Sequence, residues 1–229
     1  GTKIIAADNT DTSASLYRST DSGMTWSAVT NGGSAFLKRW KRVASSSDGS
    51  VLLASEHSGY LWYSINSGSN WTQVTTAGST TWTGVALSSD GSVMAAVANP
   101  SDFWVSTNTG TTWNNPTGLD SAAPVDIAIS SDGTKMAAVV FSGGSGIYTS
   151  SNTGTTWTER TTGLGTGTYP GFWSSIAMSS DGTKLVASRV YGDPMFTSTD
   201  SGLTWTERAS PPAGAWAGVA SSSDGSRLI

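Results

Sequence analysis

One decapeptide recurs along the chain and constrains its fold more than any other feature. Its pattern is Trp-x-x-Val/Ile-Ala-x-Ser-Ser-Asp-Gly, with full copies at 40–49, 82–91, 173–182 and 216–225. A fifth copy, at 124–133, has Pro124 in place of the tryptophan. The aspartates of successive copies are 42, 42, 49 and 43 residues apart. This spacing indicates structural repeats of about 40–45 residues.

A second signature, eight residues long, alternates with the first. Its pattern is Ser-x-Asp/Asn-x-Gly-x-Thr/Asn-Trp, and its copies lie at 19–26, 64–71, 106–113, 150–157 and 198–205. The tryptophans that end these copies are 45, 42, 44 and 48 residues apart. Five copies of each signature at one period predict five structural units.

One complete unit predicts four short strands, at 40–45, 51–55, 60–64 and 70–75. An Asp-Gly pair between the first two apolar runs is a hairpin signal, because glycine accepts the positive φ that such a turn requires. No helical period interrupts the pattern. Four strands in a repeat of this length are typical of a propeller blade. We therefore predict an all-β fold, a five-bladed β-propeller of four-stranded antiparallel blades.

The two ends of the sequence predict how the ring closes. The opening residues GTKIIAA match the second strand of a unit, and the last residues supply a first strand. The first blade would thus combine residues 1–30 with 216–229, which removes the open edges of the ring. The other blades of this single domain, 1–229, are expected at 40–75, 82–117, 124–161 and 173–208. An open solenoid of the same repeats is the alternative.

Composition excludes several function classes. Charged residues make up 12% of the chain and the formal net charge is −4, whereas a nucleic-acid binder needs a basic surface. The chain has no cysteine and one histidine, His57, so we expect no thiolate chemistry, no metal and no cofactor. No apolar run is long enough to span a membrane, and no signal peptide is visible. Abundant Ser and Thr with few charges favour an extracellular or cell-surface protein, expected to be a monomer.

The second signature resembles the Asp-box, or BNR-type, repeat. The family motif Ser-x-Asp-x-Gly-x-Thr-Trp is matched in full at 19–26 and 198–205, and the other three copies carry Asn for Asp. The copy at 64–71 also has Asn70 in place of Thr. Similar repeats build the propellers of sialidase-like, sortilin-like and xyloglucanase-like proteins. The resemblance therefore implies a fold rather than one activity.

We expect the box side chains to be structural. An Asp or Asn can close its turn by accepting a backbone N–H bond two residues on, and the tryptophans are expected to pack between blades. So short a turn offers too few oxygens for calcium. The residues concerned are Asp21, Asn66, Asn108, Asn152 and Asp200, with Trp26, Trp71, Trp113, Trp157 and Trp205.

Candidate ligand-binding residues gather where the first strands of the units begin. Four of these strands begin with a tryptophan: Trp40, Trp82, Trp173 and Trp216. Either these rings pack between blades, or they line sugar-binding sites, since aromatic faces bind the C–H side of sugars.

A charged run surrounds the first of these tryptophans. It reads Lys38-Arg39-Trp40-Lys41-Arg42, and it is either a solvated loop or a receptor for an anionic ligand. Asp126 occupies the place of Arg42 in another unit. We expect the two side chains to meet across the channel, as an ion pair or as part of a ligand pocket.

Catalysis is the less favoured interpretation. The residue set of a sialidase is absent, since Arg160 and Arg208 belong to outer strands and the Arg-Ile/Leu-Pro motif is missing. Another glycosidase would need two carboxylates about 5–10 Å apart. The candidates on the loop face are Asp8, Asp11, Glu56, Asp102, Asp120, Asp126 and Asp193.

The sequence therefore predicts a non-catalytic binding propeller, with no catalytic residue assigned. The first hypothesis is a lectin-like module that binds carbohydrate at the loop face. A protein-interaction, structural or engineered scaffold propeller is the alternative, and a glycoside hydrolase is the third. Neither a nucleic acid nor a membrane is expected as a partner.

Overall fold

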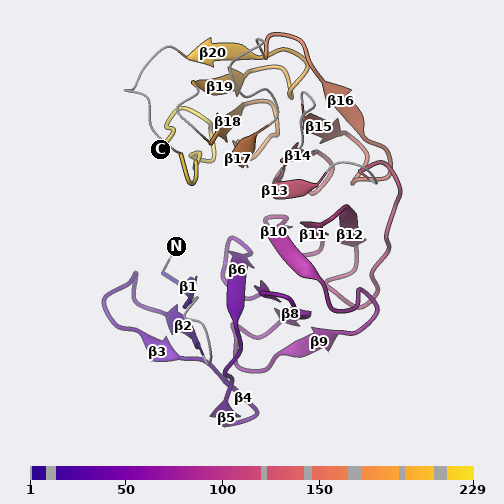
Figure 1. Cartoon of the computed structure of the whole chain (residues 1–229). Coiled ribbons are helices and arrows are strands. Elements are labelled where there is room, and N and C mark those ends of the chain that lie inside the picture. Colours follow the sequence, from indigo (N-terminus) through magenta and orange to yellow (C-terminus); the bar gives the residue numbers. More distant parts are fainter. Residues whose placement is uncertain are drawn as a thin grey trace. The chain divides into compact units, whose positions relative to one another are not determined.

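The computed structural model describes residues 2–8, 14–119, 123–141, 146–164, 172–190, 194–208 and 216–229. The regular structure in these ranges consists of strands arranged in six antiparallel sheets (Figure 1). They contain no helix long and apolar enough to cross a membrane. The chain divides into two compact units, residues 1–96 with 104–115 and residues 97–103 with 116–229.

The first unit begins with a sheet of three strands, followed by a small hairpin and a sheet of four. A further sheet contains the boundary between the two units. The strands are β1 (Ile4–Ala7), β2 (Leu16–Ser19) and β3 (Ser27–Ala28); β4 (Thr30–Asn31) and β5 (Ser34–Ala35); β6 (Trp40–Ser45), β7 (Leu52–Glu56), β8 (Leu61–Ser64) and β9 (Thr72–Val74); and β10 (Thr81–Leu87), β11 (Met94–Asn99) and β12 (Asp102–Ser106).

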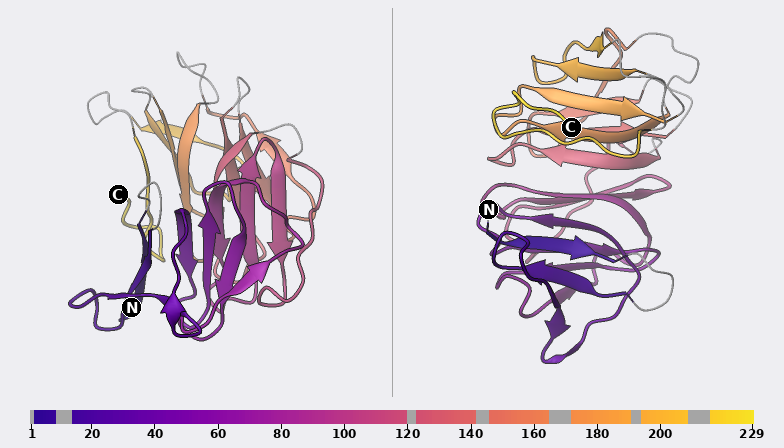
Figure 2. Two further views of the ribbon diagram at one scale, coloured as in Figure 1. Left: turned by 60° about the horizontal axis from the view of Figure 1, so that its bottom comes forward. Right: turned by 90° about the vertical axis from the view of Figure 1, so that its left-hand side faces the viewer.

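The second unit contains two sheets of four strands. They are β13 (Pro124–Ile129), β14 (Met136–Val140), β15 (Ile147–Ser150) and β16 (Thr158–Arg160), then β17 (Trp173–Met178), β18 (Leu185–Arg189), β19 (Met195–Ser198) and β20 (Thr206–Arg208). In every sheet the strands follow one another in chain order, so each sheet is an antiparallel meander (Figure 2).

The turn between β6 and β7 explains why the Asp-Gly signature recurs. Ser46 Oγ and Ser50 N both donate to Asp48 Oδ1, at 2.7 and 2.9 Å, while Val51 N donates to Ser46 Oγ at 3.0 Å. Gly49 has a φ of +69°, as predicted for this hairpin. The same bonds recur in the other four copies of the signature, at 88–93, 130–135, 179–184 and 222–227.

These turns also join neighbouring sheets within each unit. In the first unit, Ser47 N donates to Ser89 O at 2.8 Å. In the second, Ser131 N donates to Ser180 O at 2.7 Å. These two turns are therefore satisfied both internally and by the next repeat, which favours keeping their short sequence constant.

Aromatic side chains form the core of the first unit beneath β6 and β8. The ring centroid of Phe36 lies 4.9 Å from those of both Trp40 and Trp62, and 5.9 Å from that of Trp71. Rings at these separations contribute contact energy beyond the area that they bury. This cluster ties the start of β6 to the tryptophan of the second signature.

The corresponding core of the second unit contains a buried arginine. The guanidinium of Arg189, 1% exposed, lies 4.5 Å from the ring centroid of Trp173 and 4.6 Å from that of Phe196. Arg189 Nη2 also donates to Leu164 O at 2.9 Å. Two aromatic faces and a carbonyl thus stabilise this cation inside the core.

The four strands predicted for the unit at 40–75 are confirmed to within two residues at each end. The prediction of a fourth strand within 82–117 is wrong, because a single bridge between Val105 and Asn114 stands in its place. Pro116 follows closely and has no N–H to extend a ladder. The hairpin of β4 and β5 was not predicted, although Gly32-Gly33 between them, at φ +60° and +82°, is a turn signal.

The C-terminal residues form the beginning of another repeat. Ala220 N donates to Ile229 O at 2.7 Å, Ile229 N donates back at 3.0 Å, and Ser221 bridges to Leu228. Residues 220–229 therefore form an Asp-Gly turn closed by an isolated bridge, at the place where other repeats have their first two strands. The sheet of β1 to β3 has no first strand of its own, as predicted.

Candidate functional site

The five boxes of the second signature form turns with the same bonds. In the first copy, Asp21 Oδ1 accepts a bond from Thr25 N at 2.9 Å, and Gly23 N donates to Ser19 Oγ at 2.8 Å. The aspartate therefore closes the turn four residues on, not two as we predicted. The glycine has the expected positive φ, and so does Ser22 before it, at 62°.

Asparagine replaces aspartate in the boxes without losing the turn. The side-chain oxygens of Asn66, Asn108 and Asn152 accept the backbone N–H four residues on at 2.8–2.9 Å. In the copies with aspartate, bonds from the threonine hydroxyl and N–H lower the pKa of Asp21 and of Asp200 from 3.8 to about 2. These carboxylates already accept bonds from their own turns, as expected of structural groups.

Four of the box tryptophans are partly or fully covered, but Trp26 is not. The side chains of Trp71, Trp113 and Trp205 are 4–7% exposed and Trp157 is half-buried. Trp26 is 44% exposed, so the expectation that it packs between blades is not met in its own unit. Trp71 contacts Phe36, in the connection that precedes its own sheet.

Three of the four tryptophans that begin first strands are buried. Trp40, Trp82 and Trp173 are 0% exposed, and Trp82 Nε1 donates to Gly59 O at 2.9 Å. A ring without exposed surface has no face on which to stack a sugar. This burial favours the packing interpretation for these three, while Trp216 is half-buried.

The charged run at 38–42 contains two anchored cations. Lys38 Nζ lies 3.4 Å from Glu56 Oε1, which also accepts a bond of 2.6 Å from Trp62 Nε1. Arg42 is exposed, and its Nε donates to Thr83 O at 2.9 Å. The run is thus a structured segment in which the exposed guanidinium of Arg42 is held in place.

Arg39 and Lys41 complete the segment between these anchors. Arg39 is exposed, and its backbone carbonyl accepts a bond from His57 N in the β7–β8 connection. Lys41 is half-buried. We call residues 38–42 the basic segment.

Asp126 is bound to the neighbouring sheet. Its Oδ2 accepts bonds from Ser175 Oγ at 2.7 Å and Ile176 N at 3.1 Å, and its Oδ1 accepts one from Ile127 N at 3.0 Å. These bonds join β13 to β17 within the second unit. The meeting of Asp126 with Arg42 across a channel stays a prediction.

The carboxylates considered for a hydrolase are in part structural. Glu56 and Asp126 are bonded as described above. Asp11, Asp120 and Asp193 lie outside the described residues. Among the described residues, no group of three or more His, Asp or Glu side chains could hold a metal ion.

Comparison with solved structures identifies the fold class. A GH74 enzyme of Niastella koreensis superposes with a TM-score of 0.69 at 20% identity, over 97% of this chain and 32% of that chain. YCF48 bound to a D1 peptide gives 0.59 at 16% identity, over 85% and 60%. YCF48 from Cyanidioschyzon merolae gives 0.52 at 14% identity, over 90% and 85%. No protein-family model and no curated protein matches the sequence.

These neighbours are β-propeller proteins, so the chain has an all-β, propeller-like fold. Identities of 14–20% are evidence for the fold alone. The chain spans about a third of the length of the GH74 enzyme.

Proposed function

We propose that this chain is a non-catalytic binding propeller and that its ligand is an acidic segment of a protein. The basic segment carries the proposal. Four of the 12 Lys and Arg residues of a chain with net charge −4 lie within these five positions. Arg42 is exposed there while its Nε is anchored to a carbonyl, which leaves its terminal nitrogens oriented for a carboxylate.

The buried tryptophans support a protein ligand over a glycan. A lectin-like site needs exposed aromatic faces, and Trp40, Trp82 and Trp173 have none. A structural neighbour is described as bound to a peptide, which supports a protein partner for this fold. Carbohydrate binding is the second candidate, favoured by the partial exposure of Trp216. Hydrolysis is supported only by fold likeness to GH74 enzymes.

We further propose five blades in a closed ring, with boxes of the Asp-box type. In this arrangement the strand at 216–221 pairs with β1, whose sheet lacks a first strand. When the repeats are aligned, Leu228 and Ile229 correspond to Ile4 and Ile5 of β1. If β1 is the second strand of the closing blade, Leu228 and Ile229 must give up their own pairing with the strand at 216–221. Their exposure, 44% and 88%, is consistent with a weakly held end.

Fluorescence anisotropy with a labelled decapeptide of alternating Glu and Leu tests the proposed function. The matched uncharged control peptide has Gln in place of each Glu. We expect binding of the acidic probe alone, weakened about tenfold or more by Arg39→Gln with Arg42→Gln. Arg208→Gln with Arg227→Gln removes the same charge elsewhere and should leave affinity unchanged. Equal loss in both double variants would mean attraction by net charge and would overturn the assignment to the basic segment.

A further inference from the structure

A groove lies between the sheet of β13–β16 and the sheet of β17–β20. It is at the ends of the strands that lead into the turns of the second signature. Its volume is about 280 Å³, close to the size of small-molecule pockets. The first sheet contributes Lys135, Met136 and Arg160, and the second contributes Met178, Asp200 and Leu203. All of these residues belong to the second unit.

The groove contains a fixed arginine with unused donors. Arg160 Nε donates to Thr149 Oγ1 at 2.7 Å, which holds the guanidinium against β15. Its terminal nitrogens have no bond to any of the described residues. Lys135 Nζ donates to Asp181 O at 2.8 Å and retains further donors. A fixed planar fork of this kind is suited to a carboxylate.

Apolar side chains form part of the remaining wall, beside six serine and threonine residues, and the net charge is small. Met136 is fully buried, Met178 is partly buried, and Leu203 is 52% exposed at the rim. Two cations and the Asp200 carboxylate give the lining a net charge of +1. A monoanion with an apolar body fits these walls better than a phosphate dianion.

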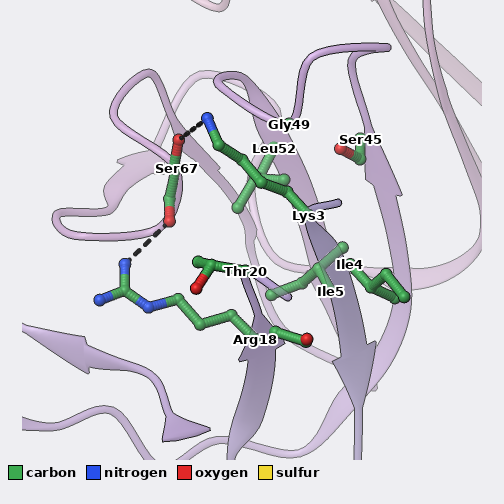
Figure 3. A pocket seen from close by; sticks show the side chains of 10 residues that line it. Lys3, Ile4, Ile5, Arg18, Thr20, Ser45, Gly49, Leu52 and Ser67 are labelled. Carbon is green, nitrogen blue, oxygen red and sulfur yellow. Dashed lines mark hydrogen bonds between the residues drawn. The ribbon is translucent and has the colours of Figure 1, made fainter. Parts of the chain in front are cut away.

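The equivalent groove in the first unit is already filled by the chain itself. There, Lys3 and Arg18 reach the neighbouring box, where Arg18 Nη1 donates to Ser67 O at 3.0 Å and Lys3 Nζ to Ser67 Oγ at 3.2 Å (Figure 3). The space left is about 10 Å³.

In the second unit, Thr149 occupies the position of Arg18. Its short side chain does not bridge the gap, and Arg160 from the outermost strand turns back onto it. The open groove of the second unit thus goes with the short side chain of Thr149, where the first unit has Arg18.

We propose that the groove of Arg160 binds a small organic monocarboxylate with an apolar body. The carboxylate accepts bonds from the terminal nitrogens of Arg160, and the apolar body lies on Met178 and Leu203. An N-acylated apolar amino acid has this chemistry and about this size. The proposal does not depend on the function proposed for the basic segment.

Isothermal titration of the full chain with N-acetyl-L-leucine tests the site, with the uncharged N-acetyl-L-leucinamide as the matched ligand. We expect Arg160→Gln, and separately Leu203→Asp, to raise Kd about tenfold or more, and the amide to bind at least as weakly. Arg227→Gln is the control, because Arg227 is exposed and lines neither this groove nor the similar groove of about 290 Å³ that contains Arg208.

Thermal unfolding establishes that each variant is folded, and Leu203→Asp changes a side chain exposed enough to tolerate it. Equal binding of acid and amide would overturn the proposal. An unchanged Kd in folded Arg160→Gln would also do so, as would a loss confined to Arg227→Gln. No binding up to the solubility limit of the acid would contradict it directly.

Discussion

Asp126 and Ser175 join two neighbouring sheets through one short bond, in which Ser175 Oγ donates to Asp126 Oδ2 at 2.7 Å. The same carboxylate accepts Ile176 N and Ile127 N, so three donors share one side chain. Position 126 therefore acts as a connection between β13 and β17. Arg42, at the equivalent position of another repeat, instead donates from Nε to Thr83 O.

Removing this carboxylate should weaken the second unit. We expect Asp126→Ala to lower the free energy of unfolding by about 2–3 kcal/mol, because the donors lose a charged acceptor. Asp126→Asn keeps an acceptor oxygen and should lose less. Urea unfolding of the three proteins measures both effects. Equal stability of the alanine variant would show that the bonds contribute nothing.

Stability should fall in acid because of the turn carboxylates. Hydrogen bonds from backbone N–H groups and hydroxyls lower the pKa of Asp48 from 3.8 to about 2, and Asp21 and Asp200 are lowered to the same value. When a carboxyl group has a lower pKa in the folded chain than in the unfolded chain, its ionised form stabilises the fold at pH values above the unfolded-state pKa. That contribution is lost as the pH falls through the folded-state value.

The unfolding midpoint should therefore be flat from about pH 7 to 5 and should decrease between about pH 4 and 2. Asp200→Asn tests the origin of this loss, since Asn152 makes the same turn bond in a neighbouring repeat. The variant should be less stable than the wild type at neutral pH, because it lacks the ionised carboxylate, and should show a weaker decrease in acid. A midpoint that stays constant down to pH 2 would contradict the assignment.

Two buried tryptophans offer a matched pair of substitutions. Trp82 Nε1 donates to Gly59 O, whereas Trp40 Nε1 has no bond to the described residues. Both rings are fully buried. Trp82→Phe should therefore cost about 1 kcal/mol more stability than Trp40→Phe, as measured by urea unfolding. Loss of ligand binding in either variant, with stability retained, would restore the interpretation of these rings as a ligand platform.

The proposed ring closure predicts a specific disulfide. Val43 pairs with Ala54 in the sheet of β6–β9, and the equivalent positions at the closure are Val219 and Ala6. Ala6→Cys with Val219→Cys should oxidise within one chain, because cross-strand Cβ atoms come close enough for a disulfide.

The unsubstituted chain has no cysteine, so mass spectrometry after thiol labelling gives a clear result. Ala6→Cys with Ala177→Cys is the control, because Ala177 already pairs with Val186. Oxidation of the control pair to the same extent, or only between chains, would contradict the closure.

Much of the fold followed from spacing along the chain. The Asp-Gly turns, the strands of the unit at 40–75 and the box turns depend on local chemistry, which a repeat displays several times over. The fourth strand at 82–117 failed because Pro116 interrupts a ladder that the other units continue.

The candidate site was less predictable because burial depends on neighbours that are distant in sequence. A tryptophan at the start of a strand has the same local pattern whether it faces a ligand or Phe36. The bond between Arg160 and Thr149 was also missed, since it joins two strands by side chains alone. The sequence did contain a signal for the groove. Thr149 has a short side chain at a position where other repeats have the long side chains of Arg18 and Tyr63.

The most direct test of the account is a screen of the purified chain against a peptide array and a glycan array in parallel. We predict binding to acidic peptides that is weakened about tenfold or more in Arg39→Gln with Arg42→Gln, and no specific glycan signal. Glycan binding that survives this double change and is lost in Trp216→Ala would contradict it, and would place the ligand on an aromatic surface instead.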